Sequence, residues 1–168
     1  MIIKSHRLTM VPISLEFEES FVKILTDVSV MKYDFNGPLS DEEARELFRF
    51  WLDKKIPGEI GVKAILNADS EFVGYCGVLP STVEDCVEHE LDYRILPKFA
   101  GKGYAEEAAS AYVQHMKKET TIHDLISMIK PYQSTDIGAA QRIGMRFDKE
   151  ICIEGRRNHL YRVHLLNT

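Results

Sequence analysis

The sequence predicts one mixed α/β domain, in which a mostly antiparallel central sheet of about six or seven strands is flanked by about four helices. The chain has 168 residues, a length that suits one domain with a sizeable core. Hydrophobic residues make up 45% and charged residues 28%, which is ordinary for a globular protein. Strand-like and helix-like segments alternate without an internal repeat or a linker. We therefore treat residues 1–168 as a single domain.

The first part of the chain predicts one strand followed by two helices. Residues 2–13 alternate in the manner of a strand, and residues 15–28 place apolar side chains at helical spacing. A second helix is expected to begin at Ser40, because Ser40 and Glu43 have the spacing of a capping box. A Pro-Gly pair at residue 57 ends that segment.

The middle of the chain predicts three strands and a long helix. The strands are expected over residues 62–68, 71–79 and 87–96. The helix is expected over residues 103–118, where one face carries Ala105, Ala108, Ala109, Tyr112, Val113 and Met116.

The last part of the chain predicts a strand, a short helix and a final pair of strands. These elements are expected over residues 122–129, 136–143, 145–154 and 159–166, and Gly144 closes the helix. One strand–helix–strand connection beside hairpins implies a sheet of mixed direction.

Composition and charge exclude several classes of protein. A net charge of −5 argues against a nucleic-acid binder, which usually has a basic face. No apolar stretch has the length of a signal peptide or a membrane span, and the six histidines show no metal-binding spacing. The cysteines are odd in number and lack CxxC spacing: Cys76, Cys86 and Cys152. We expect a cytoplasmic protein that binds neither nucleic acid, membrane nor metal.

The segment LPKFAGKGYAEEA, residues 96–108, carries the strongest local signal. A strand ends there, two glycines follow, and a helix begins at once. The first turn of a helix leaves about four amide N–H groups unpaired and attracts phosphate, and glycine lets the backbone approach a ligand closely. The spacing fits neither a Walker A loop nor a dinucleotide fingerprint. From the segment alone, an ordinary loop and a phosphate cradle both remain open.

The same segment resembles the acyl-CoA-binding motif of the GNAT N-acetyltransferases, written Gln/Arg-x-x-Gly-x-Gly/Ala. Its form GKGYAEEA resembles the RimJ/RimL-like branch, the ribosomal-protein N-terminal acetyltransferases. The opening HRLTMVPI and the later IKPYQSTDIGAAQRIGMRF resemble two further motifs of that branch, in the same order and at similar distances. The resemblance covers almost the whole chain.

This resemblance implies the GNAT fold and acetyl-CoA as the acetyl donor. The implied reaction is direct transfer of the acetyl group to a primary amine, with a protein or peptide N-terminus as the favoured acceptor. Two alternatives stay open: a small amine such as a polyamine, amino sugar or antibiotic, and a catalytically weak CoA-binding regulatory relative. The implied assembly is a monomer or a homodimer.

The resemblance also implies which residues bind coenzyme A. Arg94 and Ile95 would contact the pantetheine arm through main-chain groups, and Gln133 stands where the family has an asparagine. Two further departures from the family pattern are Ala100 and Asp136. The residues expected at the pyrophosphate are Gly101, Lys102, Gly103, Tyr104, Ala105 and Glu106. Lys102 is either a charge near the phosphates or an exposed lysine.

The strand over residues 87–95 carries the candidate catalytic groups. Alternation places Glu88, Glu90, Asp92 and Arg94 on one face, which is unusual for a packed core. We expect Glu90 and Asp92 to bind the acceptor ammonium and relay its proton; the alternative is an exposed edge where Arg94 pairs with a carboxylate.

A donor for the leaving thiolate is harder to identify. The tyrosine that serves this role in many GNAT enzymes falls on Ala140 here, and alanine cannot donate a proton. Tyr132 is the nearest candidate, and aromatic packing is its alternative role.

Overall fold

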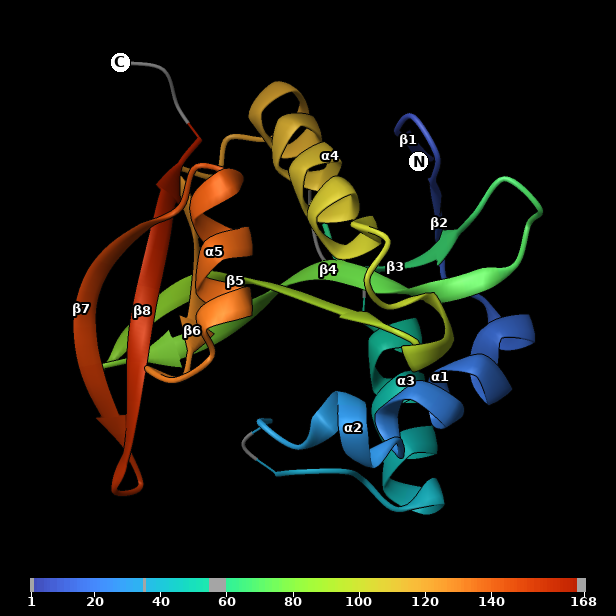
Figure 1. Ribbon diagram of the computed structural model, residues 1–168, viewed down its shortest axis with the longest axis horizontal. Coiled ribbons are helices and arrows are strands. Elements are labelled where there is room, and N and C mark those ends of the chain that lie inside the picture. The colour runs from blue at the N-terminus through green and yellow to red at the C-terminus, as the bar shows by residue number, and fades with distance from the viewer. Residues whose placement is uncertain (1, 35, 55–59, 166–168) are drawn as a thin grey trace.

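The computed structural model describes residues 2–34, 36–54 and 60–165, and within them eight strands form one sheet in the order β1-β2-β3-β4-β5-β6-β8-β7 (Figure 1). Neighbouring strands are antiparallel except β5 and β6, which are parallel. The strands are β1 (Ile3–Lys4), β2 (Thr9–Pro12), β3 (Val62–Leu66), β4 (Phe72–Val83), β5 (Cys86–Ile95), β6 (Asp124–Ile129), β7 (Arg146–Ile153) and β8 (Arg156–His164).

Helices cover both faces of this sheet (Figure 1). On one face lie α1 (Glu18–Leu25), α2 (Val28–Met31) and α3 (Asp41–Asp53), and on the other lie α4 (Tyr104–Glu119) and α5 (Ser134–Arg142). No helix among the described residues is long and apolar enough to cross a membrane. The predicted fold class is confirmed, with one more strand and one more helix than expected.

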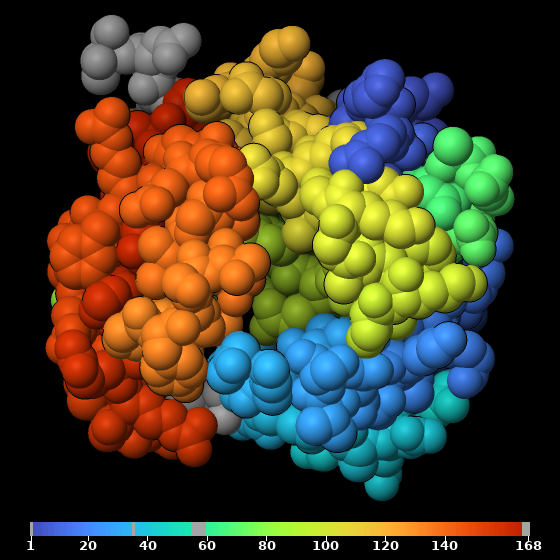
Figure 2. All heavy atoms as spheres, viewed as in Figure 1, coloured from blue at the N-terminus to red at the C-terminus, as the bar shows by residue number. Residues whose placement is uncertain are grey.

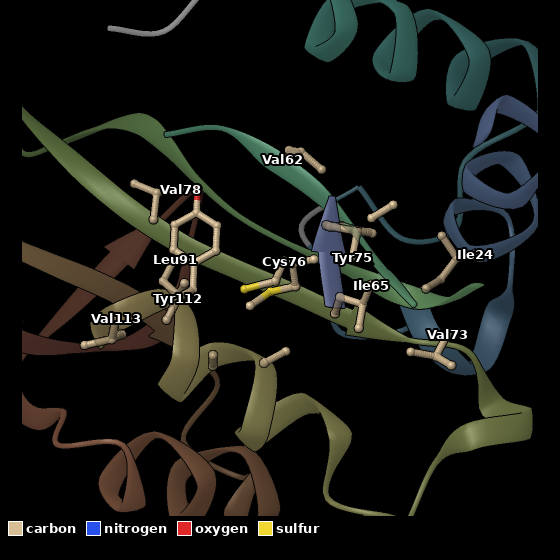
Figure 3. Packing of buried hydrophobic residues seen from close by; sticks show 14 of the residues in the cluster. Ile24, Val62, Ile65, Val73, Tyr75, Cys76, Val78, Leu91, Tyr112 and Val113 are labelled. Atoms are coloured by element: carbon tan, nitrogen blue, oxygen red, sulfur yellow. The ribbon is translucent and has the colours of Figure 1, made fainter. Parts of the chain in front are cut away.

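Two successive residues of β4 show how the core divides between the faces. The Tyr75 ring stacks on Phe21 of α1, with centroids 5.3 Å apart, and meets Trp51 of α3 at 5.4 Å. Cys76 points to the opposite face, toward Tyr112 of α4 (Figure 3). Adjacent side chains of a strand alternate in this way, so β4 anchors both helical layers.

The extra strand and helix arise because two predicted elements are broken. The segment 2–13 forms two strands, since Ser5 N–H donates to Leu8 O at 2.9 Å and the chain reverses there. The segment 15–28 breaks at Thr26, whose hydroxyl donates to Val22 O at 2.7 Å, and at Asp27, which caps α2. Hydroxyl and carboxylate side chains of this kind compete with helix hydrogen bonds.

The other predicted elements are present with shifted ends, while the Pro-Gly pair at residue 57, predicted to end the second helix, lies outside the described residues. The capping box of α3 is present, with Ser40 Oγ accepting from Glu43 N–H at 3.1 Å. Strand β4 runs on to Val83, beyond the predicted end at residue 79, and α5 begins at Ser134 rather than residue 136. The longer β4 aligns β5 over ten paired positions.

Strand β5 has very different neighbours on its two sides. On one side it pairs with β4 over its whole length, whereas on the other it pairs with β6 only at Glu90, opposite Ile126. Arg162 of β8 ties the start of β5 to the sheet, because its guanidinium donates two 3.0 Å hydrogen bonds to Glu88. Beyond Glu90 the two parallel strands diverge and leave a cleft.

Candidate active site

The cleft between β5 and β6 is a cavity of about 790 Å³. Its walls come from both strands and from α2, the first turn of α4 and the start of α5. Figure 2 shows the opening as a hollow bordered by α5 in orange, the α4 turn in yellow and α2 in light blue. This volume suits a small-molecule site.

The first turn of α4 closes one end of the cleft. Gly103 is the N-cap residue, with φ of 78°, and no side chain caps the helix. The first helical hydrogen bond runs from Glu107 N–H to Gly103 O at 3.1 Å. The amides of Tyr104, Ala105 and Glu106 therefore have no acceptor among the described residues. Amides of this kind, at the positive end of a helix dipole, suit a pyrophosphate.

Gly101 leaves room in front of these amides. Its φ is 80°, and a Cβ built at this position would have no neighbour within 4 Å. Lys102 is exposed, with Nζ 5.8 Å from the centroid of the Phe99 ring. This geometry is compatible with either predicted role of Lys102.

Arg7 holds this loop in place, and its role was missed by sequence reasoning. Its Nη1 donates to Lys102 O at 2.8 Å, its Nε contacts Glu107 at 2.7 Å, and its guanidinium lies 4.7 Å from the Tyr104 ring centroid. Arg7 is 95 residues from Lys102 and 100 residues from Glu107 in the sequence, so only the fold, which brings the turn between β1 and β2 beside the start of α4, reveals these contacts.

Glu90 lies in the cleft wall at the point where β5 and β6 separate. Burial raises the pKa of its carboxyl group to about 7, the negative charge of Asp92 adds to this, and a hydrogen bond with Ser81 works against it. A carboxyl group with a pKa near neutrality can accept a proton at physiological pH.

Asp92 points to the same cleft but is already engaged. Its carboxylate lies 3.0 Å from Arg94 Nη1 and accepts a 3.1 Å hydrogen bond from the Tyr75 hydroxyl. Arg94 Nη2 also donates to Asp34 at 2.8 Å, in the segment after α2. These carboxylates raise the pKa of Arg94 and fix the cleft wall to the helical layer.

The main chain of β5 presents alternate residues to the cleft. The Arg94 carbonyl points toward β4, since it would lie 2.1 Å from a Cβ placed on Gly74. The Leu91 carbonyl points the other way and accepts from Ser127 Oγ at 3.1 Å. By alternation, the main-chain groups of Tyr93 and Ile95 face the cleft. The main-chain carbonyl of Arg94 is thus directed toward β4 and not into the cleft.

The segment after β6 forms the opposite wall. Gln133 lines the cavity, where its Oε1 accepts from Lys130 N–H at 2.8 Å and its Nε2 donates to Asp136 at 2.7 Å. Tyr132 is exposed and is not among the residues that line the cavity, but its ring lies edge-to-face against Tyr33, which does, with the centroids 5.6 Å apart. The two tyrosines thus bridge the walls of the cleft.

The structure brings most of the predicted site residues to one cleft. Glu90, Asp92, Arg94, Ile95, Ala105 and Gln133 line it. Gly101 to Tyr104 and Glu106 lie beside Ala105 in the loop and first turn of α4 but do not line this cavity. Tyr93 was missed: it lines the cleft, its pKa is raised by burial, and its hydroxyl makes none of the hydrogen bonds found among the described residues. Over those same residues, no group of three or more ligand-type side chains is placed to hold a metal ion.

Comparisons with known proteins agree with this architecture. A family profile described as "Acetyltransferase (GNAT) domain" matches residues 7–146. The uncharacterized protein YkkB of Bacillus subtilis is 30% identical over 134 residues, which are 78% of this chain and 76% of that protein. The FsC-acetyl coenzyme A-N(2)-transacetylase of Aspergillus fumigatus is 31% identical over 128 residues, which are 71% of this chain and 54% of that protein.

Solved structures share the fold at lower identity. A GNAT-family acetyltransferase from Bacillus anthracis superimposes with a TM-score of 0.82 at 24% identity, covering 98% of this chain and 99% of that chain. RimL, described as a ribosomal L7/L12 alpha-N-protein acetyltransferase in complex with coenzyme A, gives a TM-score of 0.79 at 14% identity, covering 98% of each chain.

Proposed function

Since the chain belongs to the GNAT acetyltransferase family, we propose that it transfers the acetyl group of acetyl-CoA directly to a primary amine, with the α-amine of a protein or peptide N-terminus as the leading acceptor. The branch assignment, RimJ/RimL-like, is part of this proposal. The observation that carries it is the divergence of β5 and β6 at Glu90, which puts a carboxyl group of near-neutral pKa inside a cleft that also reaches the uncapped turn of α4.

The residues around the cleft fit acetyl-CoA, which supplies the acetyl group as a thioester. The free amides of Tyr104, Ala105 and Glu106 would hold the pyrophosphate, and Gly101 and Gly103 leave it room. Lys102 would add positive charge near the phosphates. The main-chain groups of Tyr93 and Ile95, together with Gln133, would hold the pantetheine arm along the cleft.

Glu90 would act as the general base. An α-amine with a pKa of about 8 costs only about 1.4 kcal/mol to deprotonate at pH 7, whereas a lysine amine costs about 4.6 kcal/mol. A carboxylate with a pKa of about 7 is sufficient for the first task. This difference favours an N-terminal α-amine as the acceptor.

Asp92 would support this step through its charge. It helps to keep the pKa of Glu90 high, and it attracts the incoming ammonium. Arg94 keeps Asp92 and the α2 segment in position.

The amine nitrogen forms its bond to the acetyl carbonyl carbon as the carbon–sulfur bond breaks, and the proton passes to Glu90. The departing thiolate needs a proton, for which Tyr132 at the cleft rim remains our candidate donor. Tyr93 is a second phenol in the cleft wall, held protonated by burial.

The proposal is tested by measuring free-thiol release from acetyl-CoA against N-terminal peptides, polyamines and aminoglycosides. We expect turnover to be fastest with peptides that have a free N-terminus, and absent with N-terminally blocked copies. The proposal would be contradicted if acetyl-CoA raised the thermal stability of the protein but released no free thiol in the presence of any of these amines.

A further inference from the structure

Lys130, directly after β6, is a buried lysine in the wall of the cleft. Only 9% of the residue is exposed, and Nζ donates to Asn158 Oδ1 at 2.8 Å. Asn158 of β8 is itself buried and also lines the cavity. The proposed function assigns no role to this pair.

The charge of Lys130 is not neutralised by the protein around it. An ammonium has three N–H donors, and one of them is satisfied by the neutral Asn158 amide. No carboxylate of the described residues lies within 4.0 Å of Nζ. A buried charge is costly unless it is paired, so an unpaired lysine that faces a cavity indicates an anionic ligand.

None of the carboxylates that line the cleft forms an ion pair with Lys130, and three of them have other partners. Asp34 and Asp92 share Arg94, and Asp136 accepts from Gln133. Glu90 and Glu154 also line the cavity, and neither forms an ion pair with Lys130. The negative partner of Lys130 is therefore missing from the described protein.

The strand register places Lys130 on the acceptor side of the sheet. Glu90 lies opposite Ile126, so residues 126, 128 and 130 share the face of Glu90 and Asp92. Lys130 lies four residues beyond this register position, which is about 13 Å along the strand. If the reactive amine of an acceptor lies at Glu90, only a group several bonds away from that amine in the same molecule can contact Lys130.

We propose that Lys130 selects acceptors that carry a carboxylate several bonds away from the reactive amine. This inference rests on the proposed function and names its substrate class: an N-terminal peptide with an acidic residue in its first few positions, or a short peptide with a free C-terminal carboxylate. A polycationic amine would instead meet the charge of Lys130 and be disfavoured.

The experiment measures binding, so that it does not depend on turnover. Calorimetry with protein saturated with coenzyme A compares Ser-Ala-Ala amide, Ser-Glu-Ala amide, Ser-Ala-Ala with a free carboxylate, and Ser-Lys-Ala amide. We expect at least one carboxylate-bearing peptide to bind about tenfold or more tightly than the neutral amide, and the lysine peptide to bind most weakly. The two carboxylate-bearing peptides distinguish a side chain from a C-terminus as the source of the anion.

Variants then assign the preference to Lys130. Lys130→Gln keeps a donor for Asn158 but removes the charge, and it should abolish the preference without weakening the neutral peptide or coenzyme A. Asn158→Asp supplies an internal carboxylate and should have the same effect, while Lys130→Arg should retain the preference. Lys117→Gln, in the exposed last turn of α4, is the control for the loss of one positive charge.

Three results would overturn the proposal: equal binding of all four peptides, an unchanged preference in Lys130→Gln, or a loss of coenzyme A affinity alone in that variant. The last would assign Lys130 to the cofactor phosphates. Preferential binding of an acidic peptide without acetyl transfer would support Lys130 and contradict the proposed function, so the two failures are distinguishable.

Discussion

The Arg94 guanidinium lies 3.0 Å from the Asp92 carboxylate. Glu90 and Asp92 lie on the same face of β5, and this ion pair gives Asp92 a different electrostatic environment from Glu90. Asp92 has Arg94 and Tyr75 as partners, whereas Glu90 has no cationic group within 4.0 Å among the described residues. Burial, with the charge of Asp92 added to it, raises the pKa of Glu90 to about 7, against the smaller opposing charge of Arg94. This difference supports our proposal that Glu90 takes the proton while Asp92 acts through its charge.

Replacing Asp92 by Asn should move the pH dependence of acetyl transfer to lower pH. The charge of Asp92 raises the pKa of Glu90, and its removal also leaves Arg94 less neutralised, so both effects lower that pKa. The pH profile of kcat/KM with one fixed acceptor measures the shift, because the titration of the amine is then common to both proteins. Asp53→Asn, at the exposed end of α3, is the control for the loss of one charge. A midpoint that stays in place or moves up would rule out this electrostatic role.

Glu90→Gln should stabilise the protein at high pH and leave it unchanged at low pH. The pKa of Glu90 is raised from 4.5 to about 7 in the fold, so the folded state binds its proton more tightly. That contribution is fully present below pH 4.5 and is lost as the pH rises through 7, a change of about 3 kcal/mol in the free energy of unfolding. Thermal unfolding should show the variant several degrees above wild type at pH 8 and level with it at pH 4. Glu119→Gln, at the exposed end of α4, is the control for the loss of one carboxyl group, and a Glu90→Gln variant less stable than wild type at pH 8 would contradict the assignment.

Gly101→Ala and Gly103→Val should weaken acetyl-CoA binding about tenfold or more while the fold is retained. At Gly101 the added Cβ meets open space, so the loss would come from the ligand it displaces and from the left-handed backbone. Gly155→Ala, in the β7–β8 turn, is a matched control with φ of 77° and the same open surroundings. Calorimetric titration with acetyl-CoA measures the affinity. Unchanged affinity in folded Gly101→Ala and Gly103→Val proteins would make this segment an ordinary loop.

Arg7→Ala should raise the acetyl-CoA dissociation constant about fivefold, since a lost hydrogen bond to the loop is worth about 1 kcal/mol. Arg7 contacts Lys102 O and Glu107 but lies outside the cleft wall, so we expect KM for acetyl-CoA to change and kcat to stay constant. Arg157→Ala removes a comparable exposed ion pair, with Glu150, far along the sheet. If the two variants bind acetyl-CoA equally well, Arg7 does not position the loop.

The sequence predicts most of the fold because its strongest patterns are local. The capping box at Ser40 and the alternation in β5 both depend on neighbours within a few residues, and both are present in the structure. The segment 2–13 misleads because a strand pattern does not reveal that the chain reverses at Ser5. That reversal is fixed by the ladder between β1 and β2.

The candidate site also combines features that are visible in the sequence with features that appear only in the fold. The glycines before α4 are visible in the sequence because a helix start and its amides are local features. The roles of Arg7 and of the Lys130–Asn158 pair are not visible in the sequence, because they depend on contacts between segments that are far apart along the chain. The difference between Glu90 and Asp92 also depends on Asp34 and Tyr75, which reach Arg94 and Asp92 only in the folded chain.

The central claim is that Glu90 accepts the amine proton in acetyl transfer from acetyl-CoA. Its most direct test is the rate of thiol release from pH 5 to 9 for wild type and Glu90→Gln with one peptide acceptor. We predict that wild-type kcat/KM rises through a midpoint near 7. In the variant we expect a rate about 100-fold or more lower, with that midpoint gone and acetyl-CoA affinity unchanged. A variant with the wild-type rate and the wild-type pH profile would contradict the claim.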